Sequence, residues 1–154
     1  MEEIKYIWQE FGSVESCEAI LRALPDWFGL EHAIVEYVET MQSYPILKAV
    51  KGDEVIGFTS VKKHNPSSAE LYVMGVLPNY HRQGIGREMV KAIETRLRAV
   101  GISFLQVKTL DASRANDAYD KTRMFYASQD FVPLEVFPTL WGENNPCVQM
   151  VKAL

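Results

Sequence analysis

The chain has 154 residues, of which 47% are hydrophobic and 23% charged, with 9 glycines and 7 prolines. This composition is typical of one globular domain over residues 1–154, and it excludes disordered, collagen-like and coiled-coil proteins. Because 16 Lys and Arg stand against 20 Asp and Glu, the net charge is −4, and we expect no nucleic-acid partner, which would need a basic surface.

The first elements expected are a weak strand over 4–8 and two helices. Hydrophobic residues three or four positions apart mark the first helix: Val14, Cys17, Leu21 and Leu24. Ser13 is the expected N-cap of this helix, and Pro25 ends the pattern. A second helix is expected over 31–41. Its core-facing residues are expected to be Ile34, Met41 and either Tyr37 or Val38.

Three strands are expected next, and the first two form a predicted hairpin. They cover 46–50 and 55–63, and the polar link between them contains Gly52, as hairpin turns often do. A turn at 64–68 then leads to an apolar strand over 70–77.

Residues 84–100 give the clearest helical pattern. Its buried face is expected to hold Ile85, Met89, Val90, Ile93, Leu97 and Val100, and Gly101 is the expected C-terminal stop. The last elements expected are a strand over 104–109, a helix over 116–128, and strands over 131–137 and 148–152. This order predicts an α/β (mixed α+β) fold, with a central mixed sheet of six to seven strands flanked by four helices.

The cysteines do not indicate a disulfide or a metal site. Cys17 and Cys147 form no CxxC pair and have no histidine at ligand spacing, and Cys147 is expected to be a small buried filler. The three histidines are isolated, so each is expected to be solvated or hydrogen-bonded: His32, His64 and His81. The N-terminus is acidic, and the longest apolar run, 71–78, is far shorter than the ~20 residues that cross a bilayer. We expect a cytoplasmic protein without a membrane partner.

Most of the chemical information lies in one segment, Val76-Leu77-Pro78-Asn79-Tyr80-His81-Arg82-Gln83-Gly84-Ile85-Gly86-Arg87. A buried strand ends, a polar loop follows, and two glycines open a long helix. The N–H groups of a helix N-terminus lack intrahelical partners and favour anions. Gly84 and Gly86 would let the backbone approach a pyrophosphate, and Arg82 and Arg87 add positive charge. The alternative is a glycine turn that serves only helix packing.

The hexamer His81-Arg82-Gln83-Gly84-Ile85-Gly86 resembles the signature of the GNAT superfamily of acyl-coenzyme A-dependent N-acyltransferases. That signature is Arg or Gln, two residues, Gly, any residue, then Gly or Ala, so His81 departs from it. The resemblance implies acetyl-CoA as co-substrate, no metal, and a fold whose fourth and fifth strands splay apart. The residues that it implies for coenzyme binding are Met74, Gly75, Val76, His81, Arg82, Gln83, Gly84, Ile85, Gly86, Arg87 and Tyr119.

A second segment supports the same resemblance. Residues 119–126, followed by Phe131, are similar to the second GNAT motif, with Tyr119 in place of the usual Asn and Asp130 in place of the usual Gly. With both motifs at the expected separation, the resemblance covers most of the chain.

The resemblance also implies catalytic roles. Tyr126 matches the tyrosine that protonates the coenzyme sulfur, and an ordinary tyrosine stays protonated at neutral pH. A backbone N–H at Val76 or a neighbour is expected to stabilise the oxyanion. Glu70 matches the glutamate base of the histone-acetylating branch. The alternatives are a packing role for Tyr126 and an exposed strand-end carboxylate at Glu70. Gly75 either marks a bulge or relieves crowding beneath a helix.

Acceptor recognition is implied at two loops, 25–32 and 138–146. The aromatic residues expected to contact the acceptor are Trp27, Phe28, Tyr72 and Trp141, and the alternative is that such aromatics only cap the core. Carboxylates that are candidates to hold a cationic amine are Asp26, Glu36, Glu135 and Glu143.

Together these features predict an N-acetyltransferase that transfers an acetyl group from acetyl-CoA to a primary amine of a small molecule, an amino acid or a protein. The transfer is expected to occur by direct attack in a ternary complex. Acetyl-CoA and the amine are then its partners, and the resemblance also allows a homodimer. The alternative is a non-catalytic acyl-CoA sensor or interaction module on the same fold, which the departures at His81 and Tyr119 keep open.

Overall fold

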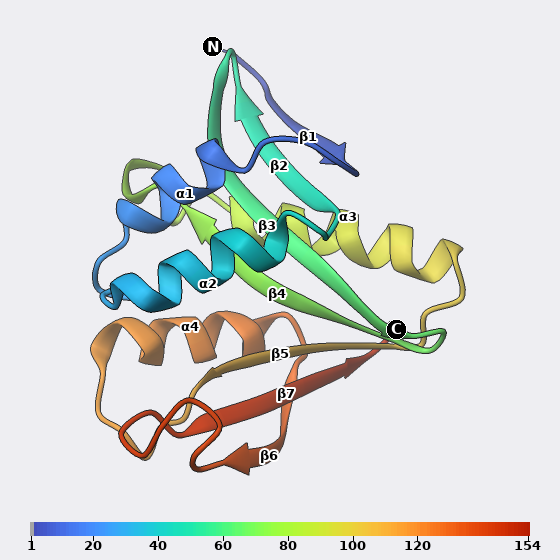
Figure 1. The fold of residues 1–154 in the computed structure, drawn as a ribbon. Coiled ribbons are helices and arrows are strands. Elements are labelled where there is room, and N and C mark those ends of the chain that lie inside the picture. The colour runs from blue at the N-terminus through green and yellow to red at the C-terminus, as the bar shows by residue number, and fades with distance from the viewer. Residues whose placement is uncertain (1) are drawn as a thin grey trace. The chain divides into compact units, whose positions relative to one another are not determined.

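The computed structural model describes residues 2–154, which form seven strands and four α-helices (Figure 1). The strands are β1 (Ile4–Gln9), β2 (Ile46–Lys51), β3 (Glu54–Asn65), β4 (Ser68–Val76), β5 (Phe104–Leu110), β6 (Val132–Phe137) and β7 (Cys147–Ala153). The helices are α1 (Glu15–Arg22), α2 (Glu31–Met41), α3 (Ile85–Ala99) and α4 (Asp117–Ser128), with a short 3-10 helix, η1 (Pro78–Tyr80). Every predicted element is present, and the predicted ends lie within two residues of those found.

Hydrogen bonds join the strands in the order β1-β2-β3-β4-β5-β7-β6. The pairs β1–β2, β2–β3, β5–β7 and β6–β7 are antiparallel, whereas β4 and β5 run parallel. The predicted mixed sheet is therefore confirmed. The chain forms two compact units, of which the first comprises residues 1–62 and 71–96 and the second residues 63–70 and 97–154.

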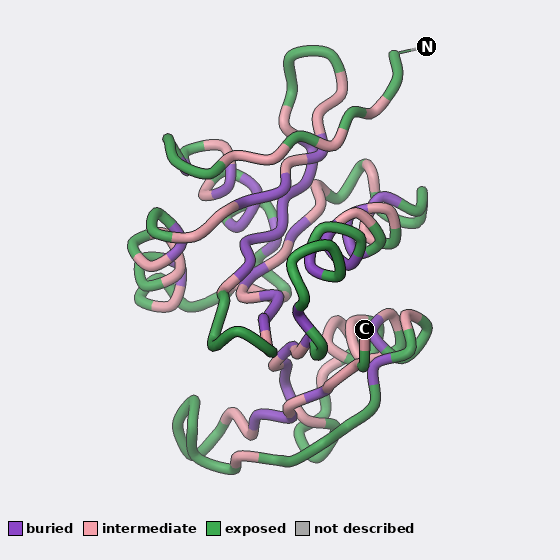
Figure 2. The backbone as a smooth tube through the Cα atoms, turned by 90° about the vertical axis from the view of Figure 1, so that its right-hand side faces the viewer, coloured by how far each residue is buried: buried purple, intermediate pink, exposed green. Residues whose placement is uncertain are grey.

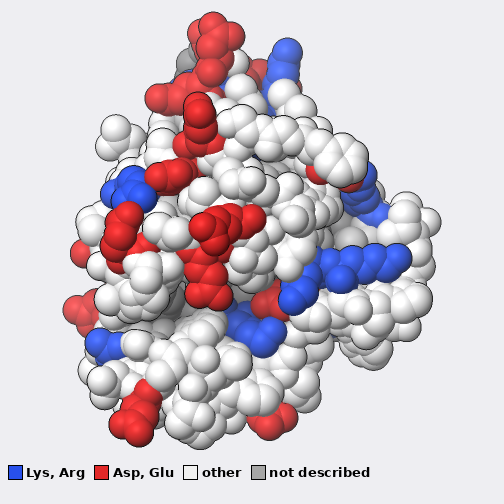
Figure 3. Space-filling model, in the orientation of Figure 1, with Lys and Arg blue, Asp and Glu red and all other residues white. Residues whose placement is uncertain are grey.

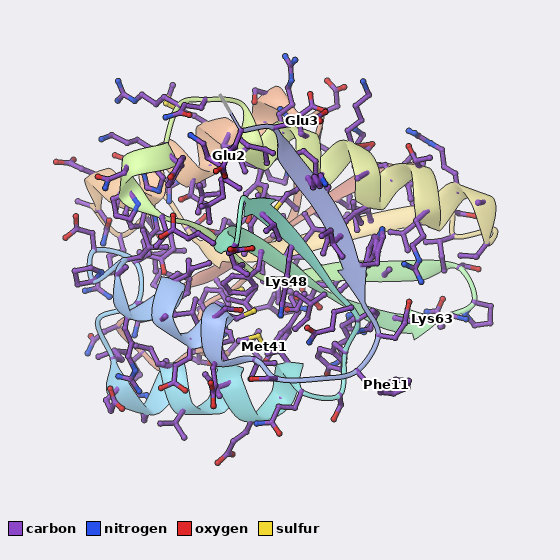
Figure 4. The ribbon with its side chains drawn as sticks, turned by 90° about the horizontal axis from the view of Figure 1, so that it is seen from above. Glu2, Glu3, Phe11, Met41, Lys48 and Lys63 are labelled. Atoms are coloured by element: carbon purple, nitrogen blue, oxygen red, sulfur yellow. The ribbon has the colours of Figure 1, made fainter. Side chains whose placement is uncertain are left out.

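The core of the first unit lies where α1 and α2 pack on the strands. Its buried residues are Val14, Cys17, Ile20, Leu21, Leu24, Ile34, Met41, Ile46, Phe58 and Val73, and Figure 2 shows burial concentrated along the strands. Met41 points in among these side chains, whereas Phe11, 89% exposed, projects outward (Figure 4). Tyr37 and Val38 both pack against the cluster. The predicted inner faces of the two helices are thus confirmed.

The start of α1 differs from the prediction. The N-cap is Val14. Ser13 lies one residue before the N-cap, and its hydroxyl accepts the N–H of Glu15 at 3.2 Å. Val14 is only 6% exposed, because its side chain is drawn into the core before the first helical turn begins. The predicted N-cap at Ser13 is therefore wrong by one position.

One residue of the predicted buried face of α3 is also wrong. Val100 is 68% exposed, whereas the other five are at most 9% exposed. The helix ends at Ala99, and Gly101 turns the chain with φ +83°. The N–H of Ile102 then returns to the carbonyl of Leu97 at 3.0 Å, so Ile102 takes the buried place. Gly101 is the predicted stop.

The second unit packs α4 with β5, β7 and β6. Its buried apolar residues include Ala69, Ile102, Leu105, Val107, Leu110, Phe131, Cys147, Val148 and Met150. Asn116 caps α4, since its side-chain oxygen accepts the N–H of Tyr119 at 3.1 Å. After α4, Asp130 has φ +71°. That backbone conformation explains why glycine suits this position in the resembled motif. None of the helices in residues 2–154 is long and apolar enough to cross a membrane.

Strand β6 is the last strand of the sheet and is largely exposed. Its apolar residues Val132, Leu134 and Val136 are 58%, 62% and 43% exposed. The register with β7 shifts between Pro133 and Glu135, so the ladder is interrupted in the middle of the strand.

Gly75 of β4 leaves no room for a side chain. A Cβ there would lie 3.0 Å from Cγ2 of Ile20, 3.1 Å from Cδ1 of Leu24 and 3.4 Å from Cε1 of Phe58. Ile20 belongs to α1 and Leu24 follows it, so the missing side chain lets this helix lie close against β4. The contacts support the interpretation that Gly75 relieves crowding beneath a helix.

We expect Gly75→Ala to lower the free energy of unfolding by about 1–3 kcal/mol, because the added methyl overpacks the contact with α1. Urea unfolding of wild type, Gly75→Ala, Ile20→Ala and the double variant measures this. In the Ile20→Ala background, which removes the closest atom, the cost of Gly75→Ala should shrink. Equal costs in the two backgrounds would contradict the packing explanation.

Candidate active site

The loop between η1 and α3 has the geometry of an anion site. Gly84 has φ +80°, and a Cβ there would meet nothing within 4 Å. Arg82 also has a positive φ, 61°, which costs a non-glycine residue roughly 1–2 kcal/mol. The N–H of Glu88 bonds to the carbonyl of Gly84 at 3.0 Å, so the helical ladder starts there. The N–H groups of residues 85–87 then have no partner within the helix and can bind phosphate oxygens.

The end of β4 directs alternate backbone groups to opposite sides. Leu77 donates its N–H to the carbonyl of Ile56 in β3 at 2.8 Å. Because successive N–H groups of a strand alternate in direction, those of Met74 and Val76 point away from β3. Of the three positions predicted to line the pantetheine or the oxyanion, Met74 and Val76 therefore share one N–H orientation, whereas the N–H of Gly75 points toward β3.

His81 ties the loop back to β4. Its Nε2 lies 2.6 Å from the carbonyl oxygen of Val76, and Nε2 must donate, because a carbonyl only accepts. The imidazole also meets the Trp27 ring edge-on, with centroids 5.8 Å apart. His81, which stands where the GNAT signature has Arg or Gln, thus contacts Val76 and Trp27 of the protein itself. Backbone N–H groups and nearby arginines remain available for a phosphate in this loop.

Aromatic rings form a chain in the first unit. Phe28 meets Tyr37, Tyr37 meets Tyr72, and Tyr44 meets Tyr72, with centroids 5.9, 5.5 and 5.3 Å apart and all edge-on. Trp27, Phe28 and Tyr72 all pack against the core cluster of this unit. Three of the four predicted acceptor-contacting aromatics are therefore in one structural neighbourhood. Trp141 belongs to the second unit and is 38% exposed.

Glu70 is a buried, doubly paired carboxylate of the second unit. It is 5% exposed, and its Oε1 lies 2.7 Å from Nε2 of His64 and 3.0 Å from Nζ of Lys108. His64 comes from the end of β3 and Lys108 from β5. The interpretation of Glu70 as an exposed strand-end carboxylate is wrong, because β4 begins two residues earlier, at Ser68.

Tyr126 of α4 lies in the same unit and is 7% exposed. Burial raises the pKa of Tyr126 well above its ordinary value, and the nearby Tyr119 and Glu70 raise it further. Burial also raises the pKa of Tyr119 to about 12 and that of the Cys147 thiol to about 11. Tyr126 therefore keeps its proton at neutral pH, whereas Cys147 is an unreactive buried thiol.

The family model described as "Acetyltransferase (GNAT) family" matches residues 4–124. The chain belongs to this family. Among curated proteins it is similar to mycothiol acetyltransferases. That of Corynebacterium glutamicum (strain R) is 36% identical over 72 residues, covering 46% of this chain and 24% of that protein. That of Actinosynnema mirum is 29% identical over 94 residues, covering 60% of this chain and 27% of that protein. The chain thus matches about a quarter of the length of these relatives.

Solved structures show the same fold over nearly the whole chain. A GNAT acetyltransferase of Desulfovibrio desulfuricans has a TM-score of 0.79 at 15% identity, covering 98% of this chain and 99% of that one. One from Elizabethkingia anophelis with acetyl-CoA bound has a TM-score of 0.72 at 17% identity and 98% coverage of both. The Escherichia coli ribosomal-protein-S18-alanine N-acetyltransferase has a TM-score of 0.71 at 17% identity, and the match covers 97% of this chain and 94% of that one. The GNAT fold predicted from the two motifs is confirmed.

Two partners of the candidate GNAT base were not predicted. His64 resembles any isolated histidine in the sequence, and Lys108 resembles any strand lysine. The available signal is the alternation of Gln106 and Lys108 with buried Leu105 and Val107, which marks a polar face on β5. That signal shows that Lys108 shares a face with polar residues but does not reveal which carboxylate it meets.

Acidic side chains gather over α1 and α2 (Figure 3). Arg22 holds two of them, with nitrogen–oxygen distances of 2.9 Å to Glu18 and 2.7 Å to Glu31. Of the carboxylates predicted to hold an amine, all four are exposed: Asp26 and Glu36 in the first unit, and Glu135 and Glu143 in the second.

The raised pKa of Tyr119 makes stability depend on alkaline pH. The unfolded chain ionises this phenol near pH 10, before the folded protein does at about 12, so stability is complete below pH 10 and falls as pH rises through 12. Between pH 8 and 11 we expect about 1 kcal/mol of this loss, and Tyr119→Phe should remove it. Urea unfolding at both pH values measures the difference, and an unchanged pH dependence in the variant would contradict it.

Proposed function

We propose that this GNAT protein transfers an acetyl group from acetyl-CoA to a primary amine by direct attack in a ternary complex. The observation that carries the proposal is the loop before α3, where Gly84 has an open Cβ position and three helix N–H groups lack helical partners. A pyrophosphate fits such a loop because its oxygens accept from the N–H groups and no side chain occupies the approach. The acetyl-CoA bound to the Elizabethkingia anophelis neighbour supports the choice of ligand.

The backbone at the end of β4 supports a role in the transfer step. In that step the amine nitrogen bonds to the thioester carbon and the carbonyl oxygen gains negative charge. An N–H that points away from β3, at Val76 or Met74, would donate to that oxygen. A preorganised donor of this kind contributes about 3 kcal/mol to the barrier reduction. The pantetheine is proposed to lie along the same residues of β4.

Tyr126 and Glu70 supply the two proton transfers. When the carbon–sulfur bond breaks, the leaving thiolate takes the phenolic proton of Tyr126. Glu70 accepts the proton that the ammonium loses before or during attack. The two groups influence each other electrostatically, and their environments differ, since Tyr126 is held neutral by burial while Glu70 is paired with the ammonium of Lys108. Environments that separate an acid from a base in this way are typical of acid–base catalysis.

The acceptor is proposed to be an amine that meets aromatic surface. Trp27, Phe28 and Tyr72 would supply one wall, with Asp26 or Glu36 beside a cationic acceptor, and Trp141 would contribute from its own loop. We also propose a reducing, cytoplasmic setting, because both cysteines are free thiols. The homodimer stays a prediction.

Coenzyme binding is tested first by titration calorimetry with acetyl-CoA, with dephospho-CoA and ATP as controls. We expect one-to-one binding that requires the pantetheine arm. Gly84→Ala should weaken it about tenfold, because its Cβ enters the phosphate approach. The matched control is Gly101→Ala, which has a similar φ of +83° and open Cβ space but lies outside the loop. Equal losses in both variants, or no binding to wild type, would contradict the proposed site.

Tyr126→Phe tests catalysis separately from binding. We expect kcat to fall on the order of 10²-fold, with the Kd for acetyl-CoA unchanged, because the phenol acts on the leaving sulfur. Thiol release is measured with a panel of an aminoglycoside, spermidine, free amino acids and a peptide with N-terminal alanine. Tyr6→Phe is the control. A wild type that binds acetyl-CoA but releases no thiol with any amine would favour the acyl-CoA sensor.

A further inference from the structure

The surroundings of Glu70 raise the question of where an accepted proton goes. The side chain of Glu70 is 7% exposed, whereas that of His64 is 27% exposed. Both His64 and Lys108 contact the same oxygen, Oε1, and Oε2 takes part in neither contact. A carboxylate so enclosed has little direct access to bulk water. Its hydrogen-bonded partners are the routes out.

Each group that faces Glu70 can be assessed as a proton acceptor. Lys108 approaches from β5, Tyr126 from α4 and Cys147 from β7, and the last two interact with Glu70 electrostatically. Lysine, tyrosine and thiol side chains carry their protons at neutral pH, and burial raises the pKa of Tyr126 and of Cys147. Among these described neighbours, the imidazole of His64 is the group that ordinarily gains and loses a proton near neutrality.

The position of His64 also suits release to solvent. It stands at the end of β3, and residues 63–67 around the β3–β4 turn are all exposed. One ring nitrogen, Nε2, meets the buried carboxylate at 2.7 Å. An imidazole has a second nitrogen on the other side of its ring, so a proton taken up at Nε2 can leave from Nδ1.

We propose that His64 is the proton exit of the acetyl transfer, carrying the amine proton from Glu70 to water. The inference rests on the proposed function and on Glu70 as its base. The acceptor ammonium gives one proton to the Glu70 carboxylate. The resulting carboxyl O–H passes it to Nε2 of neutral His64 in its Nδ1–H tautomer, and the imidazolium releases the Nδ1 proton to solvent. The ring is then the Nε2–H tautomer, and proton exchange of the imidazole with solvent restores the Nδ1–H form for the next turnover. Glu70 is thereby returned to its anionic state, which the ammonium of Lys108 at 3.0 Å stabilises.

His64→Gln tests the exit, because a glutamine amide can still donate to Glu70 but cannot carry a proton. We expect kcat to fall on the order of 10²-fold, while the Kd for acetyl-CoA and the urea midpoint stay those of wild type.

Two further variants separate proton transfer from structure. His64→Ala should regain part of its kcat when free imidazole is added, and no regain should occur with added acetamide, which hydrogen-bonds but does not buffer. Lys63→Gln, an exposed position beside His64 on β3, is the control and should leave kcat unchanged. Full activity of His64→Gln, or a His64→Ala variant that regains no kcat with imidazole, would overturn the exit while leaving the acetyltransferase intact. Wild type that turns over no amine would overturn both.

Discussion

One backbone hydrogen bond fixes the orientation on which the proposed chemistry depends: Leu77 N–H to the Ile56 carbonyl, 2.8 Å. It sets which N–H groups at the end of β4 are used by β3 and which point away. A slip of one residue would reverse both sets and would also turn a side chain toward α1 at the place of Gly75. Since the space there is closed by Ile20 and Leu24, packing on one face enforces the direction of the backbone at the strand's end.

At Glu70, the cost of burying a carboxylate is set against the contacts that it makes with His64 and Lys108. A carboxylate taken out of water costs several kcal/mol unless it is paired and hydrogen-bonded, and here one oxygen receives both His64 and Lys108. Well-packed apolar residues would fill the same space with less electrostatic cost. The fold nevertheless keeps three ionisable side chains from β3, β4 and β5 in contact, where access to water is restricted.

The sequence was most informative where regular patterns and a contiguous motif carried the signal. The elements and the α3 face follow from hydrophobic spacing, and the loop 81–87 is a local motif. The errors of the sequence analysis were local too: Val100 is the first residue after α3, where the positive φ of Gly101 redirects the chain. Contacts between distant residues could not be predicted. The pairing of Glu70 with Lys108 joins positions 38 apart in the chain, and the bond from His81 to Val76 depends on how the loop folds back.

Strand β6 shows how an exposed apolar edge is kept from recruiting other chains. A sheet's last strand offers a row of backbone donors and acceptors, and evenly spaced ones are a template for fibre growth. In β6 the register shift between Pro133 and Glu135 breaks that spacing beside a residue that has no N–H. The strand thereby exposes Val132, Leu134 and Val136 without presenting a continuous ladder, so its irregular backbone, together with the exposed charge of Glu135, disfavours edge-to-edge pairing.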